Sequence, residues 1–385
     1  MHQPAPVTTP EPAVAQPAPV RRLLSLDTLR GFDMFWIIGG EDIFHVLAKT
    51  TGWAWAVLIA GQFVHPDWNG FTFYDLIFPL FLFMAGVSTP FSIGSRLEKG
   101  TPKAALAQKI ITRGLILVLL GIIYNNGLFT RTLDDIRYPS VLGRIGLAGM
   151  FAQLIYVYAG RRAQYGWFAG LLLGYWALMM LVPVPGCGAG IITTECNLAS
   201  YLDRTLLPGR LLRGIHDPLG ILSTLPAISN ALLGIFAGNL LRTDGRTISQ
   251  PRKTGMLVIA GLTLLLLGWA WNFAFPVNKN LWTSSYVLVT GGLSLLLLAL
   301  FYWVIDVKGI RKWTILFTVI GMNSVLIYLA GKFIDFNHTA QYIFGGLIGF
   351  LSSDTAKGLA GVLALLAVKW VFLYFLYRKK VFLRV

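Results

Sequence analysis

A histidine and a carboxylate flank the start of a strongly apolar stretch, FVHPDWNGFTFYDLIFPLFLFMAG at 63–86. Histidine titrates near neutral pH in general, and a carboxylate beside an imidazole, as Asp75 could be beside that of His65, would fix its tautomer and raise its basicity. His65 is therefore a candidate general base for an attacking amine or hydroxyl, or itself an acceptor of an acyl group. Asn69 is a candidate hydrogen-bond donor to a developing oxyanion, and Trp68 is a candidate stacking surface for a sugar ring. A metal site is the less favoured alternative, because no tight ligand spacing such as HExxH occurs.

Acidic residues also lie inside the preceding apolar run, GFDMFWIIGGEDIFHVLA at 31–48. At the rise of an α-helix, Glu41 is about 16 Å along the axis from Arg30, which is near the middle of a membrane. A charge there costs several kcal/mol unless it is paired, protonated or hydrated. Glu41 and His45 can share a helical face with Asp42 beside them. The run therefore predicts either a buried polar cluster that joins helices or a polar cavity that reaches into the bilayer.

Further polar residues stand at the ends of other apolar runs. Each could hold helices together, but most belong to the same expected side of the membrane, as one polar pocket would require. They are His216 and Asp217 before the sixth run, Asn278, Lys279, Asn280 and Trp282 before the eighth, Asn323 and Ser324 within the ninth, and Arg144 near the outer end of the fourth.

The composition indicates which elements must position these groups. The 385 residues are 55% hydrophobic and only 13% charged, and their mean hydropathy is +0.65, too apolar for a soluble globule of this size. We expect an all-α polytopic transmembrane helix bundle with N- and C-termini in the cytoplasm. Runs long enough to cross a membrane predict about ten spans, at 31–48, 71–94, 110–125, 141–159, 165–183, 221–241, 254–274, 283–304, 313–331 and 358–377.

The net charge of +15 is explained by topology. If the N-terminus is cytoplasmic, segments on that side hold 21 of the 32 lysines and arginines, segments outside hold nine, and two fall within spans. This is the bias that membrane insertion requires, so no nucleic-acid partner is needed. We expect the run 53–64 to lie on the outer surface, and 340–352 to be interfacial or re-entrant. Residues 1–20 are rich in Pro and Ala and predict a disordered cytoplasmic tail, which leaves 21–385 as one transmembrane domain.

The two cysteines, Cys187 and Cys196, share the long outside loop 184–220. An oxidising compartment would permit a disulfide between them, and two free thiols are the alternative. The loop also predicts a short helix near SYLDRTLL at 200–207. It is too small for a separate catalytic domain but long enough to cap the outer face of the bundle.

Six segments in order along the chain carry a family resemblance. They are RLLSLDTLRGFDM at 22–34, HPDWNGFTFYDLIFPLFLFMAGVS at 65–88, IRYPSVLGRIGL at 136–147, DPLGILSTLPAISNALLGIFAG at 217–238, NKNLWTSSYVL at 278–288, and VIDVKG with GMNSVLIYLAG near 304–331. Together they resemble the heparan-α-glucosaminide N-acetyltransferase family of transmembrane acyltransferases and its bacterial relatives.

The resemblance implies transfer of an acetyl group from cytoplasmic acetyl-CoA to the amino group of a glucosamine on the far side of the membrane. The catalytic histidine of the family falls on His65 and an Asp in the next helix falls on Asp75. The family usually has an Asn in the first matched span, where this chain has GGED at 39–42, which leaves the acceptor open. Direct transfer and an acyl-His65 intermediate both stay open.

These inferences together define the expected site. We expect an amino sugar and acetyl-CoA as small-molecule partners, no resident metal, membrane lipid around the helices, and a bacterial inner (plasma) membrane location; a homodimer stays open. A membrane permease for amino sugars is the alternative function. The expected residues are His65, Asp75 and Asn69 for catalysis; Glu41, Asp42, Trp68, Asp217, Lys279, Asn280, Trp282 and Asn323 for substrate; and Arg30, Lys109, Arg113 and Arg144 for CoA.

Overall fold

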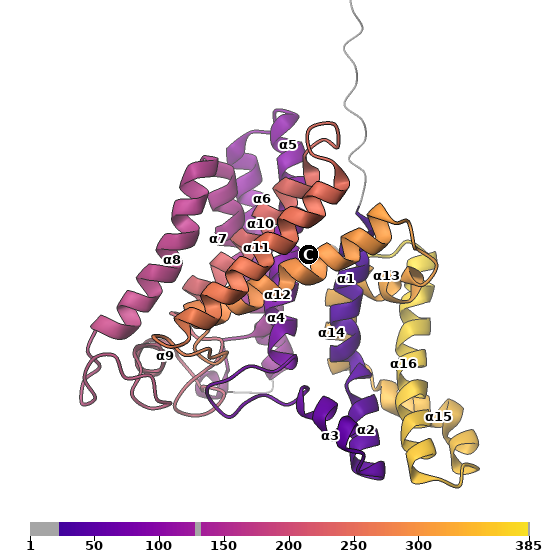
Figure 1. The fold of residues 1–385 in the computed structure, drawn as a ribbon. Coiled ribbons are helices and arrows are strands. Elements are labelled where there is room, and N and C mark those ends of the chain that lie inside the picture. Colours follow the sequence, from indigo (N-terminus) through magenta and orange to yellow (C-terminus); the bar gives the residue numbers. More distant parts are fainter. Residues whose placement is uncertain (1–22, 128–131, 384–385) are drawn as a thin grey trace, which may run out of the picture.

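The computed structural model describes residues 23–127 and 132–383, and that part of the chain contains helices and no β-strand (Figure 1). The expected tail 1–20 lies outside the described residues. The helices are α1 (Leu24–Phe35), η1 (Trp36–Gly40), α2 (Asp42–Thr51), α3 (Ala54–Gly61), α4 (Tyr74–Thr89), η2 (Pro90–Gly94), α5 (Ser95–Glu98), α6 (Lys103–Asn126), η3 (Leu133–Asp135), α7 (Val141–Tyr158), α8 (Arg161–Leu181), α9 (Leu198–Leu206), α10 (Thr224–Arg242), α11 (Gln250–Trp271), α12 (Ser284–Tyr302), η4 (Trp303–Val307), α13 (Thr314–Met322), α14 (Ser324–Phe333), α15 (Phe336–Gly349) and α16 (Asp354–Arg378).

The prediction of an all-α membrane bundle is confirmed, but the count of ten spans is not. Within the described residues, seven helices are long and apolar enough to cross a membrane, or eight if the bent pair α13–α14 is one span. The expected first span, 31–48, is interrupted by the π-helical turn η1. The expected fifth span corresponds to α8, which is not among the seven.

Close helix contacts in the bundle depend on small residues. A Cβ on Gly86 of α4 would lie 2.1 Å from the carbonyl oxygen of Ala231, and one on Gly234 of α10 would lie 2.0 Å from that of Phe83. Any larger side chain at either position would force α4 and α10 apart. The backbone of α4, which carries Asp75, is thereby fixed against α10.

Two expected spans are broken, and a polar side chain makes backbone hydrogen bonds at each break. In η1, Gly39 has φ 124°, a conformation that favours glycine, and Lys369 of α16 donates to the carbonyl oxygen of Ile38 at 2.7 Å. Between α13 and α14 the axis bends by 69° at Asn323. The Asn323 side chain donates to the carbonyl oxygen of Val381 at 3.0 Å and accepts from the amide of Leu383 at 3.2 Å, so it holds the C-terminal segment at the break.

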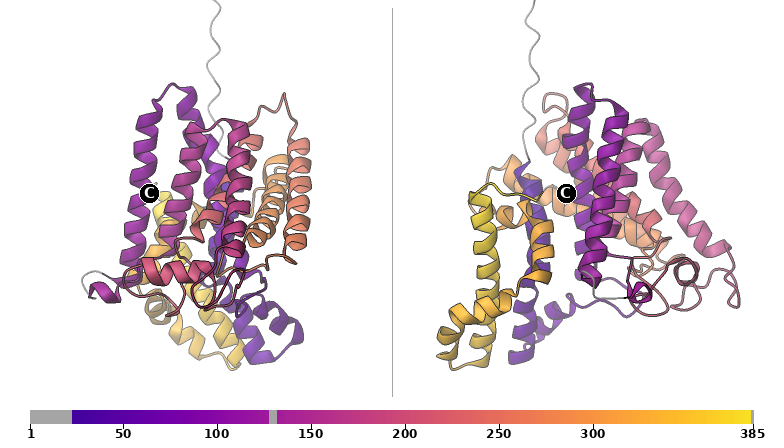
Figure 2. Two further views of the ribbon diagram at one scale, coloured as in Figure 1. Left: turned by 90° about the vertical axis from the view of Figure 1, so that its left-hand side faces the viewer. Right: turned by 180° about the vertical axis from the view of Figure 1, so that it is seen from behind.

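The short helices α2, α3, α9 and α15 lie at one end of the bundle, which is the lower end in Figure 1 (Figures 1 and 2). The short helix expected near 200–207 is α9, and Asn197 caps it by accepting from the amide of Ser200 at 2.7 Å. A disulfide joins Cys187 to Cys196 in the same loop. This end therefore carries a folded cover over the helix ends.

Candidate active site

His65 and Asp75 are in direct contact. The Nδ1 atom of His65 lies 2.7 Å from Oδ1 of Asp75. The imidazole is 39% exposed whereas the carboxylate is fully buried, so Asp75 is withheld from solvent while His65 faces the cavity described below. A carboxylate on Nδ1 holds the tautomer that keeps the lone pair on Nε2.

Two hydrogen bonds, one to its side chain and one to its backbone carbonyl, hold Asp75 at the start of α4. Its side-chain Oδ2 accepts from the amide of Thr72 at 3.0 Å in the first turn. Its carbonyl oxygen lacks the usual helical partner because residue 79 is a proline without an N–H. The hydroxyl of Tyr286, from α12, donates to that carbonyl at 2.6 Å instead. The proline therefore creates the acceptor by which α12 holds Asp75 in place.

Lys279 completes a triad of titratable groups with His65 and Asp75. Its Nζ lies 2.9 Å from Nε2 and 3.2 Å from Nδ1 of His65, and 3.5 Å from Oδ1 of Asp75. Such similar short distances to both ring nitrogens place Nζ over the face of the imidazole, because a position in the ring plane would clash with Cε1. Burial lowers the pKa of Lys279 to about 8, and the charge of Asp75 opposes that shift.

Two loops distant in sequence hold His65 and Lys279 together. The amide of Gly70 donates to the carbonyl oxygen of Val277 at 2.9 Å, and the side chain of Asn278 donates to Oδ1 of Asn69 at 3.0 Å. Asn69, expected to bind an oxyanion, thus contacts a protein amide in this structure. Asn278 is itself fixed, since its Oδ1 accepts from the amide of Leu281 at 2.9 Å.

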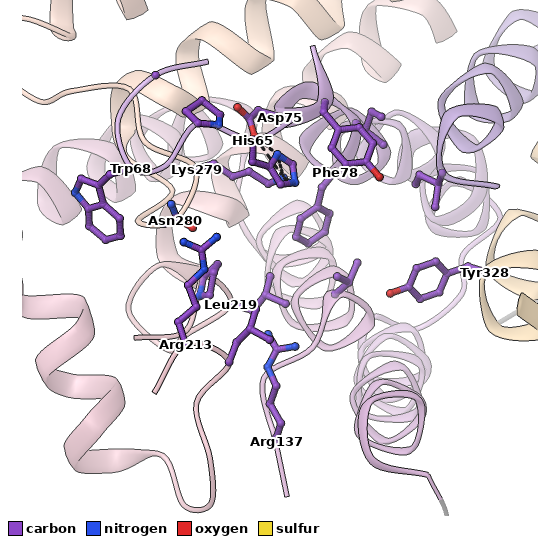
Figure 3. Close-up of a pocket in the computed structure, with 18 residues that line it drawn as sticks. His65, Trp68, Asp75, Phe78, Arg137, Arg213, Leu219, Lys279, Asn280 and Tyr328 are labelled. Carbon is purple, nitrogen blue, oxygen red and sulfur yellow. Dashed lines mark hydrogen bonds and ion pairs between the residues drawn. The ribbon is translucent and has the colours of Figure 1, made fainter. Parts of the chain in front are cut away.

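A cavity of about 340 Å³, hereafter the His65 cavity, opens beside this triad (Figure 3). Its walls include three of the expected substrate residues, Trp68, Lys279 and Asn280, and two arginines, Arg137 and Arg213. The indole N–H of Trp68 donates to the carbonyl oxygen of Ile192 at 2.8 Å, which ties the cavity to the disulfide-bonded loop. The cavity combines an imidazole, cations and an aromatic surface, the kind of lining that binds a polar small molecule.

Tyr74 connects the triad to the first expected span. Its ring lies 4.8 Å from that of His65, centroid to centroid, and its hydroxyl donates to Glu41 at 3.1 Å. Glu41 is partly buried just after the π-helical turn, and Asp42 is exposed next to it. Of these two neighbouring acids, Glu41 is therefore the one joined to the site, through Tyr74.

Asp217 is committed to protein partners. It binds Arg137 at 2.8 and 2.9 Å and accepts from the amides of Leu212 and Leu219, both at 3.0 Å. Such a bidentate pair orients the guanidinium. Asp217 thus positions Arg137 at the cavity wall, and it does not line the cavity itself.

Trp282 and Arg144 lie in the core, away from the cavity wall. The indole of Trp282 is 1% exposed and donates to Oδ1 of Asn230 at 2.9 Å. Arg144 lies over that ring at 4.9 Å, donates to the carbonyl oxygen of Gly220 at 3.1 Å, and bonds Ser223. The expected substrate contact of Trp282 and CoA contact of Arg144 have no counterpart in these positions; the two side chains join α7 and the loop before α12 to α10 and the loop before it.

A second cavity of about 520 Å³, hereafter the arginine cavity, lies among α1, α4, α6 and α7 and the C-terminal segment. Three arginines line it: Arg30, Arg96 and Arg113. Arg30 and Arg113 were expected near CoA, whereas Lys109 is exposed on α6 and does not line the cavity. The break at Asn323 is next to it, since Met322 and Ser324 are in its wall.

An apolar constriction of about 50 Å³ lies between the two cavities and shares residues with both. It shares Phe78 and Tyr328 with the His65 cavity, and Phe81 and Val325 with the arginine cavity. One face of α4 follows the whole line, because lining residues recur at intervals of three or four. They are Asp75, Phe78, Phe81, Ala85 and Ser88 on α4, with Ile37 of η1 and then Met34 and Arg30 of α1 in the same order.

Sequence reasoning missed several lining residues: Tyr74, Arg137, Arg213 and Tyr328. Tyr74 could have been found, since it adjoins Asp75 at the helix start. Tyr328 is far from the other residues in sequence, and only the bend at Asn323 brings α14 to the constriction. Among residues 23–127 and 132–383, no group of three or more His, Cys, Asp or Glu side chains has the arrangement of a metal site.

Comparison with known proteins identifies relatives along most of the chain. Residues 22–164 match a family described as a domain of unknown function, DUF5009. The human heparan-alpha-glucosaminide N-acetyltransferase is 32% identical over 424 aligned positions, covering 94% of this chain and 60% of the human protein. The mouse protein of the same name is 29% identical, covering 84% of this chain and 56% of its own length. The chain thus spans a little over half the length of these relatives, and the resemblance expected from its motifs is confirmed.

The arrangement of Tyr286 and Pro79 predicts a coupled pair of substitutions. Tyr286→Phe should lower the free energy of unfolding by about 1 to 3 kcal/mol, the cost of a buried polar group left without a partner. Adding Pro79→Ala should recover much of this loss, because the new backbone N–H can bond the Asp75 carbonyl. Thermal unfolding of both single variants and the double variant measures the coupling. Tyr342→Phe, at an exposed position, is the control. Strictly additive effects of the two substitutions would contradict this assignment.

Proposed function

Since this chain is related over most of its length to heparan-alpha-glucosaminide N-acetyltransferases, we propose that it is an integral membrane acetyltransferase that moves an acetyl group from acetyl-CoA to the amino group of a glucosamine-type sugar. The observation that carries this proposal is the His65–Asp75 pair at one end of a line of cavities that begins among arginines. Each end of that line suits one of the two substrates.

The arginine cavity suits the nucleotide part of CoA. Arginine binds phosphate bidentately, and Arg30 and Arg113 are the residues proposed for this role, with Arg96 added from the cavity wall. The constriction beyond them has an apolar lining that fits the slender pantetheine arm and gives no place to the charged phosphates. The thioester would then arrive beside Phe78 and Tyr328, at the edge of the His65 cavity.

The His65 cavity suits the acceptor. His65 Nε2 takes the proton as the acceptor amine attacks the thioester carbon, the C–S bond breaks, and the CoA thiolate leaves. Asp75 keeps Nδ1 protonated and stabilises the imidazolium that forms. Since a thiolate is a good leaving group, positioning and base catalysis are the main tasks of the protein. Trp68 and Asn280 are proposed to hold the sugar at the cavity wall.

We propose the bacterial inner membrane as the location, with the arginine cavity open to the cytoplasm and the His65 cavity to the periplasm. The charge bias along the chain supports this orientation, as does the disulfide at the end that carries the His65 cavity. CoA cannot cross the bilayer, so this orientation places the nucleotide where the cell supplies it.

A transporter of amino sugars is the second candidate, and the line of cavities through the bundle favours it. The apolar constriction argues against passage of a whole sugar, because its volume is only about 50 Å³. Uptake of glucosamine into vesicles without consumption of acetyl-CoA, unchanged in His65→Ala, would favour transport over acetylation.

For the enzyme, His65→Ala should lower the turnover of acetyl-CoA with glucosamine by a factor of about 10² to 10⁴, the usual scale for loss of a general acid or base. The assay is release of CoA thiol by the purified protein in detergent. His338→Ala, which removes an exposed histidine on α15, is the matched control and should keep full turnover. Full turnover in His65→Ala would remove this residue from the mechanism.

For the nucleotide end, Arg113→Gln should raise the KM for acetyl-CoA by about 10- to 100-fold, since a hydrogen bond to a charged group contributes about 1.5 to 3 kcal/mol. The KM for glucosamine should change little. Lys109→Gln is the control, because Lys109 lies on the same helix but outside the cavity. Equal effects of the two substitutions would mean that the phosphates bind elsewhere.

A further inference from the structure

The Nζ atom of Lys279 lies where an acceptor amine would have to be. It is a primary amine 2.9 Å from Nε2 of His65 and in the wall of the His65 cavity. Figure 3 shows Lys279 beside His65 and Asp75, with the interactions among them drawn as dashed lines. Tyr74 confines the same nitrogen from another side, with its ring centroid 5.9 Å away.

Two loops enforce this position. Lys279 follows Asn278, whose side chain and backbone bind Asn69, Leu281 and Thr283. The histidine loop is tied to the same segment through Gly70 and Val277. A lysine held only as a counter-ion for Asp75 would need contact with the carboxylate alone; this one is closer to the imidazole than to Asp75.

We propose that Lys279 is an acetyl-accepting residue of this site: when acetyl-CoA is bound and the acceptor is absent, the enzyme transfers the acetyl group to Lys279 Nζ. The inference rests on the proposed function, because it uses the same thioester and the same base. It adds a modification site and a mode of self-inactivation that acetyl transfer to a sugar does not require.

The step balances without another reactant. Neutral Nζ attacks the thioester carbon, a C–N bond forms and the C–S bond breaks. His65 Nε2 takes one proton from Nζ and passes it to the departing CoA thiolate, so the products are N-acetyl-lysine and CoA thiol. Water hydrolyses an amide too slowly to reverse the modification, so the acetylated enzyme accumulates.

Burial makes the neutral amine available. With the pKa of Lys279 lowered by burial to about 8, a far larger share of this side chain is uncharged near neutral pH than of a lysine with the ordinary pKa of about 10.4. Acetylation then removes the cation next to Asp75 and leaves an acetamide against the histidine. The acetamide is bulkier than the amine and blocks the approach of an acceptor to His65, so transfer to sugar stops and acetyl-CoA is spared while acceptor is lacking.

The test is incubation of the purified full chain in detergent with acetyl-CoA at about pH 7.5, without acceptor, followed by digestion and mass spectrometry. Acetyl occupancy at Lys279 is compared with that at Lys49 and Lys332, two exposed lysines in the same digest. We expect Lys279 to react about 10²-fold faster, because His65 lies beside it as a general base and the two exposed lysines have no such neighbour in the proposed site. Added glucosamine should slow the modification, and His65→Gln should abolish the excess at Lys279.

Two further readouts separate this inference from its alternatives. Preincubation of the unsubstituted protein with acetyl-CoA should lower its later turnover with glucosamine in proportion to the acetyl occupancy of Lys279. The Lys279→Arg variant should lose no turnover with time, measured against its own starting rate. Treatment with neutral hydroxylamine removes an acyl group from imidazole but leaves an amide, so label that survives it is on lysine and not on His65.

The outcomes distinguish the two proposals. Turnover with glucosamine but acetylation of Lys279 no faster than that of Lys49 and Lys332 overturns this inference and leaves the proposed function standing. Rapid, His65-dependent acetylation of Lys279 without turnover on glucosamine supports the inference and rejects glucosamine as the acceptor. If neither reaction occurs, both this inference and the proposed function are wrong.

Discussion

The buried carboxylate of Asp75 is the constraint on which the site depends. A charge at the start of a membrane helix is costly unless it is paired, and here His65, Lys279 and the amide of Thr72 all surround it. Removal of water strengthens each of these contacts. The same contacts favour the tautomer of His65 that leaves Nε2 able to accept a proton, so the interactions that make Asp75 tolerable also suit His65 to the role proposed for it.

The helices connect this pair to the other end of the bundle through simple periodicity. Because residues three or four apart share a helical face, α4 carries Asp75 at one end of a line of cavities and Ser88 at the other, about 20 Å away along the axis. Close contact of α4 with α10 through Gly86 and Gly234 fixes that face. Bends in the first and ninth expected spans then bring Ile37 and Tyr328 to the constriction.

The sequence was informative where a polar residue interrupts an apolar run, and less so where backbone irregularity decides the contact. His65, Asp75 and Lys279 stood out as polar groups at the ends of such runs, and they meet. The π-helical turn at Gly39 and the bend at Asn323 have no periodic signal, so neither break was expected. Trp282 follows a polar triplet and was expected at the substrate; tertiary packing buries it against Asn230 and Arg144.

The most direct test is a structure determined with a stable, non-transferable analogue of acetyl-CoA. The phosphates should lie between Arg30 and Arg113, the pantetheine arm should pass Phe81 and Tyr328, and the carbonyl carbon should lie beside His65 Nε2. Density for the whole analogue outside the bundle, or for a carbonyl that stops at the arginine cavity with the constriction closed, would contradict a shared site for thioester and base.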